Sequence, residues 1–244
     1  MKKRSVLLLA LAIGLPFGGV ASYTDSPVHA AESKQALSLA GGATYYGQVK
    51  NGLPDGRGTI KWPGGKTYSG SFVNGKRSGT GKYINDYLDN RSKYRIKQVY
   101  TGSWSNDRMN GAGTWTEKRS QSNGHVVSNE IQTGTFKNNT LASGYDVLHA
   151  EADPEYSFTY RTDGMNFNIL GHNKNLVSLW KQGSLFNVTY QKGAVSRNYS
   201  IFPEDSAKLE RERQSSLKYL QSITGQVTPH LKKFEQLSKQ VPLK

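Results

Sequence analysis

Four stretches of this chain repeat the same spacing of tyrosine, glycine and large apolar residues, and this repetition constrains the fold more than any other feature. Copies that start at Tyr45, Tyr68, Tyr100 and Gln132 each have a glycine two residues later and a large apolar residue four residues later. The glycines are Gly47, Gly70, Gly102 and Gly134, and the large residues are Val49, Phe72, Trp104 and Phe136. Repeats at this period indicate a stacked array, in which each unit buries its apolar side against the next unit.

Each copy predicts a β-hairpin. The tyrosine, glycine and large residue stand at even offsets, so they share one face of a strand. Asn51-Gly52 and Asn74-Gly75 tolerate the positive φ of a tight turn. The return strands of the first three copies carry paired glycines, which are Gly56 and Gly58, Gly79 and Gly81, and Gly111 and Gly113. We expect these glycines to leave slots that rings of the neighbouring strand fill.

The pattern Y-x-G-x-aromatic-x-N-G followed by G-x-G-x-aromatic resembles the MORN repeat. Residues 68–83 match it best, and the resemblance covers residues 45–144. It implies stacked hairpins that act in protein interaction or membrane association, sometimes by self-assembly, and that precede a catalytic domain in some relatives. In this chain such a domain would have to lie in residues 145–244.

Two departures from the regular repeat carry separate expectations. The fourth copy has Gln132 in place of the tyrosine, and Ser143 and Tyr145 stand where the paired glycines belong, so it is either a degraded cap or a chance likeness. Nine residues are inserted after each of the second and third copies. We interpret these insertions, around residues 86–99 and 117–131, as lengthened hairpin ends or loops.

The N-terminus has the form of a secretory signal peptide. Basic residues 2–4 precede an apolar stretch, and small residues offer cleavage after Ala21 or after Ala30. A retained membrane anchor is the alternative, because the stretch is long enough to cross a bilayer. We expect a signal peptide over residues 1–30 and a linker over 31–44, in a bacterial protein that is secreted or associated with the cell envelope. The chain has no cysteine, which excludes disulfides.

The remainder of the chain predicts more β structure and then helices. Residues 145–203 alternate apolar and polar residues around a turn at Asp163-Gly164 and continue through segments 176–180, 185–190 and 195–201, as a small separate sheet or a diverged extension of the array. Residues 204–244 switch to a helical period.

We expect a first helix that ends at Gly225 and a second that begins at Thr228-Pro229. The second helix is basic and amphipathic, so it either packs on its own protein, capping the sheet, or lies on a membrane. The expected fold is therefore mainly β, with stacked antiparallel hairpins, a further meander and a C-terminal pair of helices.

The net charge of +14 comes mainly from the repeats. Outside a cell, such charge attracts anionic polymers or lipid head groups. The candidate basic surface is Lys76, Arg77, Arg95 and Lys97. The alternative is that the lysines only keep the hairpins soluble and their edges unpaired. Export argues against a nucleic-acid partner.

Catalytic motifs are scarce in the sequence. The histidines are scattered with no metal-ligand spacing, and we expect neither a metal nor a cofactor. Glu151, Asp153 and Glu155 flank Pro154 and could hold a cation or serve a hydrolase acting on cell-wall material as a glycosidase-like pair. A solvated linker explains them more simply. The repeat aromatics (Tyr68, Phe72, Tyr100 and Trp104) could stack a ligand, although their period fits the core of the array better.

The sequence therefore predicts a non-enzymatic exported binding or scaffolding protein. Its partner is a protein, an anionic envelope polymer or lipid head groups. Self-association through the ends of the array is also open, because a terminal hairpin has an unpaired edge.

Overall fold

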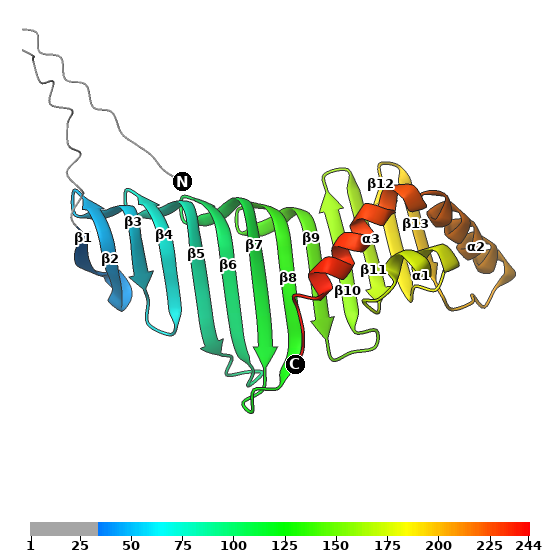
Figure 1. Ribbon diagram of the computed structural model, residues 1–244, viewed down its shortest axis with the longest axis horizontal. Helices are drawn as coiled ribbons and strands as arrows, with labels where there is room; N and C mark the ends of the chain where they lie inside the picture. The colour runs from blue at the N-terminus through cyan, green and yellow to red at the C-terminus, as the bar shows by residue number, and fades with distance from the viewer. Residues whose placement is uncertain (1–33) are drawn as a thin grey trace, which may run out of the picture. The chain divides into compact units, whose positions relative to one another are not determined.

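A computed structural model describes residues 34–244. The expected signal peptide and both cleavage positions lie outside the described residues. Thirteen antiparallel strands form one sheet in sequence order (Figure 1). The strands are β1 (Lys34–Leu39), β2 (Ala43–Lys50), β3 (Leu53–Lys61), β4 (Lys66–Val73), β5 (Lys76–Leu88), β6 (Arg95–Ser105), β7 (Arg108–Ser120), β8 (Val126–Lys137), β9 (Thr140–Ala150), β10 (Tyr156–Thr162), β11 (Met165–Gly171), β12 (Asn187–Lys192) and β13 (Val195–Ser200). The helices are α1 (Leu176–Gln182), α2 (Ala207–Ser222) and α3 (Thr224–Ser238), with a short 3-10 turn at Ala40–Gly42.

The expected linker over residues 31–44 is wrong for its described part. β1 pairs along its whole length with β2, with Leu37 opposite Tyr45 and Leu39 opposite Ala43. Leu37 and Leu39 alternate along the strand and pack against the apolar cluster of the repeats. These two leucines supply the apolar face that a first strand needs.

The hairpin turns form at the predicted Asn51 and Asn74 and at the corresponding asparagines of the third and fourth copies. Asn51, Asn74, Asn106 and Asn138 have φ between 48° and 53°, and the residue after each also has positive φ. Positive φ at both central residues is typical of a type I′ turn, whose twist matches that of the strands. The fourth copy forms a hairpin of the same kind from β8 and β9. It is not a terminal cap, because β10 pairs with β9.

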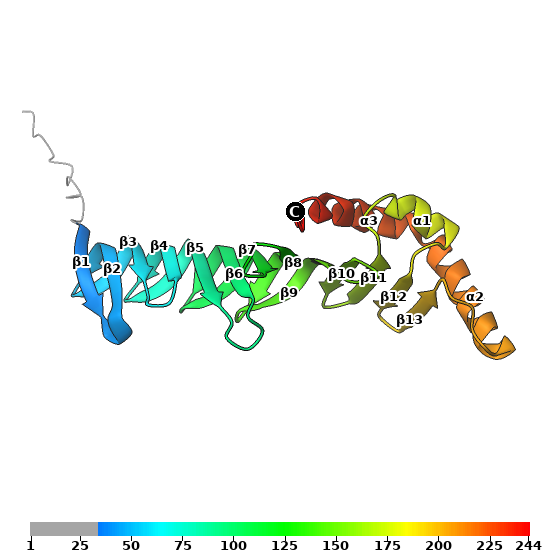
Figure 2. The same cartoon turned by 90° about the horizontal axis from the view of Figure 1, so that it is seen from below.

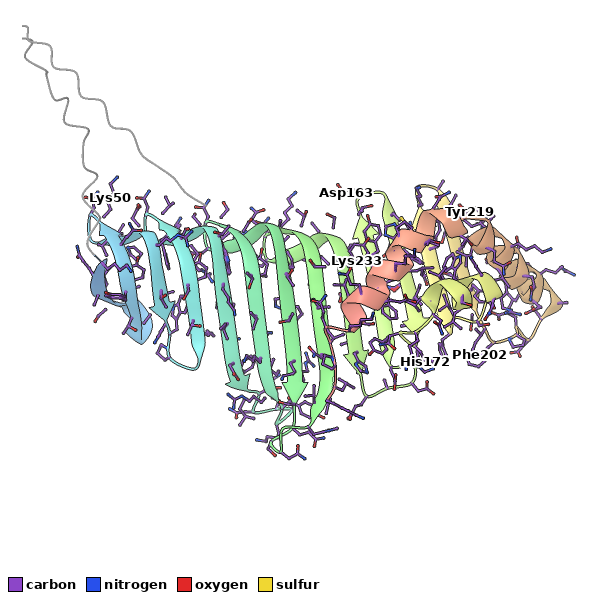
Figure 3. The ribbon with its side chains drawn as sticks, in the orientation of Figure 1. Lys50, Asp163, His172, Phe202, Tyr219 and Lys233 are labelled. Atoms are coloured by element: carbon purple, nitrogen blue, oxygen red, sulfur yellow. The ribbon has the colours of Figure 1, made fainter. Side chains whose placement is uncertain are left out.

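The insertions are lengthened hairpin ends. β5 and β6 pair out to Leu88 and Arg95, and β7 and β8 pair out to Ser120 and Val126. In Figure 1 these ends project from one edge of the sheet, while the short turns lie along the opposite edge. Lys50 and Asp163 mark that short-turn edge in Figure 3.

Residues beyond the repeats extend the same sheet, which decides between the two alternatives for residues 145–203. One expected strand is wrong, because residues 176–182 form α1. Leu176 and Trp180 are both buried at helical spacing, and Gly183 ends the helix with φ of 68°. A short apolar run fits a strand or a helix equally well by periodicity, and the left-handed glycine is what distinguishes them here.

The expected boundary between the C-terminal helices is also wrong. α2 ends at Ser222 and α3 begins at Thr224, so Gly225 lies inside α3 and Pro229 interrupts its hydrogen bonding from within. Thr228 is no cap, since its hydroxyl donates to the carbonyl of Thr224 at 2.7 Å. The buried stripe of α3, which includes Val227, stabilises the helix enough to offset the one hydrogen bond that proline cannot donate.

The register of the strands divides the sheet into two faces. We call the face that carries Tyr45, Tyr68 and Tyr100 the aromatic face, and the opposite face the helix face. α3 covers the helix face near β9 to β11, where Phe234 contacts the rings of Tyr145 and Phe158 (Figure 2). The apolar core therefore changes face along the sheet, from the aromatic face in the repeats to the helix face towards the C-terminus, and β8 and β9 contribute to both.

Candidate functional site

The aromatic face of the repeats is an interlocked core. Tyr68 lies over Gly70 and Gly81, and a Cβ added to Gly81 would come within 2.4 Å of its ring. The Tyr68 hydroxyl donates to the carbonyl of Ser71 at 3.0 Å. Its ring meets Phe72 and Trp104 edge-on, with centroids 5.1 and 5.2 Å apart. Tyr45 and Tyr100 repeat the arrangement, and all three tyrosines are buried, so these rings are packing residues and not a ligand platform.

The helix face of the repeats is open within residues 34–244 and carries a different set of side chains. Residues that are directly opposite each other on neighbouring strands share a face. One such row of opposite residues on the helix face begins at Tyr145, and its next members are Thr133, Thr114, Thr101 and Lys82. It continues through Ser69, Thr59 and Tyr46. Exposed basic residues on this face include Lys34, Arg57, Lys61, Lys82, Arg95, Lys97 and Lys118.

Acidic residues gather on the opposite side of the same strands. Glu117, Glu130 and Asp146 lie on the aromatic face, where Gln132 occupies the position of the repeat tyrosine. On the helix face, Asp86 pairs with Arg95 at 2.7 Å. The helix face thus carries mostly basic residues, whereas the aromatic face carries the first three acids together with Lys66, Arg77 and Arg119. The sequence did not reveal this segregation.

The four basic residues predicted to form one surface differ in their burial and in their ion pairs. Arg77 is largely buried, with its guanidinium 4.3 Å from the Trp104 ring centroid and its Nε 3.0 Å from Asp107. It therefore belongs to the aromatic face and does not share a face with Lys97. Arg95 is on the helix face but is paired with an acid. Lys76 and Lys97 are exposed and form no ion pair within the described residues.

A groove of about 600 Å³ crosses the helix face of β1 to β6. Its side-chain lining comes from Lys34, Tyr46, Arg57, Thr59, Ser69, Thr80, Lys82 and Thr101. Glycines that face each other on neighbouring strands contribute backbone to the same groove, namely Gly47 and Gly58, Gly70 and Gly81, together with Gly102. None of its lining residues is acidic.

The carboxylates of the aromatic face form a compact cluster that sequence reasoning missed. Gln132 Nε2 donates to Glu130 Oε1 at 2.9 Å and to Asp146 Oδ2 at 3.2 Å. Burial, with the nearby Asp146 charge, raises the pKa of Glu130 to about 7. Burial also raises the pKa of Asp146. The departure of Gln132 from the repeat pattern was the available signal, since a polar residue in the aromatic row needs polar partners.

The acidic triplet around Pro154 is divided by the fold. Glu151 pairs with His125, and Glu155 Oε2 lies 3.8 Å from His172 Nδ1. Glu151 and Glu155 line a hollow of about 820 Å³ beside the C-terminal residues, while Asp153 is not among its lining. Both carboxylates are about half exposed. Among residues 34–244, no His, Asp and Glu side chains group as metal ligands.

The described part of the chain contains no helix with the length and apolarity to cross a membrane. The family model of the MORN repeat matches residues 45–67, 68–85 and 100–116. The β8–β9 hairpin lies beyond the matched residues. No curated protein matches the chain.

Proposed function

We propose that this chain, which carries three MORN repeats, is a non-enzymatic binding protein whose helix face docks onto an anionic surface of a bacterial cell envelope. MORN repeats generally act in binding to proteins or membrane lipids. The expected export signal would bring the array to envelope polymers and lipid head groups.

The segregation of charge carries this proposal. Lys97 and Lys118 are opposite each other on neighbouring strands, and Lys82 lies on the same face. Like charges held together on one open face create a positive potential that attracts an anionic surface over about one Debye length, roughly 10 Å at 0.1 M salt. If the lysines served only to keep the protein soluble, they would not need to be concentrated on one face of the sheet.

A protein partner is the second candidate, and one observation favours it. Ile84 and Val99 are half-buried neighbours on the helix face, in the row that continues to Ile131 and Val147. Val147 is fully buried where the C-terminal residues cover the sheet. A partner with a mixed apolar and acidic surface would cover the open part of this row.

Co-sedimentation tests the proposal. The purified protein is mixed with anionic vesicles and, separately, with bacterial cell walls, at low and at high salt. We expect salt-sensitive pelleting with at least one of them and a clear loss in the Lys97→Gln/Lys118→Gln variant. The matched control, Lys66→Gln/Lys208→Gln, removes the same charge from the aromatic face and from α2. No pelleting at low salt, or equal loss in both variants, would contradict the proposal.

A further inference from the structure

The groove on the helix face runs across the strands. Its lining residues come in order from β1 to β6, so it crosses five inter-strand steps of about 4.8 Å, or about 24 Å in all. A groove of this direction is continuous over the first three hairpins and belongs to no single repeat.

Aligned bulges explain the groove. The strand register shifts directly after Gly47, Gly70 and Gly102, at the same place in each hairpin. A bulge bends its strand and increases the local twist. Because the bends lie at equivalent positions in adjacent hairpins, they line up across the sheet and curve it along one line. The concave side of this curve is the groove on the helix face. Glycine pairs on this line, such as Gly70 and Gly81, leave backbone at the surface of the groove.

The lining supplies donors to an anion along the whole length. Lys34, Arg57 and Lys82 are exposed and form no ion pair within the described residues. Between them stand hydroxyl groups, and Thr59 Oγ1 and Ser69 Oγ lie 2.9 Å apart. Guanidinium, ammonium and hydroxyl donors together suit phosphate oxygens, which accept several hydrogen bonds from different directions.

We propose that this groove binds a linear phosphate-bearing chain that lies across strands β1 to β6. The inference rests on the proposed function and names the chemistry of its ligand. A chain with an anionic group at each unit can follow cations that are spread over several strands. A flat membrane would instead contact the rims of the hollow and the exposed lysines outside it.

The test measures binding of the full chain to long-chain inorganic polyphosphate, with orthophosphate and anionic phospholipid vesicles as separate probes at equal phosphate concentration. We expect polyphosphate to bind at least about tenfold more tightly than orthophosphate, because several contacts form at once. The slope of log affinity against log salt should fall by about 0.7 for each contact that is removed.

Variants locate the site. Arg57→Gln/Lys82→Gln should weaken polyphosphate binding by about tenfold. Ser69→Glu should weaken it as well, because it places a carboxylate beside Lys82 in the groove. Lys66→Gln/Lys208→Gln serves as the charge-matched control and should bind as the parent protein does. All of these positions are exposed, so we expect each variant to fold. Thermal unfolding of each variant would check this.

The outcomes separate the two proposals. Equal polyphosphate binding by the groove variant and the control overturns the groove as the site. Binding to vesicles without binding to polyphosphate overturns the linear ligand and leaves the proposed function in place. Absence of binding to every anionic probe at low salt overturns both.

Discussion

The guanidinium carbon of Arg77 lies 4.3 Å from the centroid of the Trp104 ring, at the boundary between the second and third repeats. The rings of Tyr68 and Tyr83 are also within 6 Å of the same guanidinium. Asp107 accepts hydrogen bonds from Arg77 Nε and from its backbone N–H, both at 3.0 Å. One arginine therefore ties three strands together through ring contacts and one ion pair.

Replacement of this arginine should destabilise the array. Arg77→Ala should lower the free energy of unfolding by about 1–2 kcal/mol, because it removes a partly desolvated cation–π contact and an ion pair. Urea unfolding followed by tryptophan fluorescence would measure the change. Lys76→Ala, at the exposed neighbouring position, is the control and should change stability little. Equal effects at both positions would show that Arg77 is only a surface charge.

A methyl group at the ring slot should be poorly tolerated. Gly81→Ala would place a Cβ within 2.4 Å of the Tyr68 ring, so the ring must move and lose its edge-on contacts. We expect a loss of about 1–3 kcal/mol of stability, as for overpacked cores. Gly164→Ala is a matched control, because that position has no neighbour within 4 Å of an added Cβ. Thermal unfolding of both variants decides whether steric exclusion is the reason for the repeat glycine.

Stability should depend on pH through Glu130. Its pKa is raised from 4.5 to about 7 by burial and by the nearby Asp146 charge, with Glu117 adding to the effect. The folded protein holds a proton there that the unfolded chain releases near pH 4.5, so this contribution to stability is complete below pH 4.5 and is lost as pH rises through about 7. Glu130→Gln should thus be more stable than the parent at pH 8, with the advantage vanishing near pH 4. Burial raises the pKa of Asp146, and the charge of Arg161 only partly opposes that rise, so Arg161→Gln at the same two pH values is the comparison variant. A constant difference between Glu130→Gln and parent across this range would contradict the prediction.

The stability of the C-terminal half should depend strongly on the contact between α3 and the sheet. Phe234 of α3 is fully buried against the rings of Tyr145, Phe158 and Phe167. Phe234→Ala should cost about 3–5 kcal/mol through lost burial and the cavity that remains. Gln236→Ala, on the exposed side of the same helix, should have little effect. Denaturant unfolding measured by circular dichroism would compare the two, and similar midpoints would show that α3 is dispensable for the sheet.

Local sequence determined the hairpins. A turn such as Asn74-Gly75 needs residues that accept positive φ, and a ring such as Tyr68 can lie against the next strand only where that strand has glycine. Both requirements act within one repeat or between adjacent strands. The spacing of these residues in the sequence therefore predicts the array, its turns and its lengthened hairpin ends, and the structure agrees.

Tertiary structure decided the rest. Strand alternation says which residues of one strand share a face, but only the register across strands brings Lys97 opposite Lys118 on one side and Glu117 opposite Glu130 on the other. Long-range packing likewise places the guanidinium of Arg77 against the repeat aromatics, and it stabilises α3 so that the helix continues past Pro229. Local sequence alone determines how each hairpin forms. The charged face and its groove arise only when one hairpin pairs with the next, because strand pairing and not position in the chain decides which residues become cross-strand neighbours.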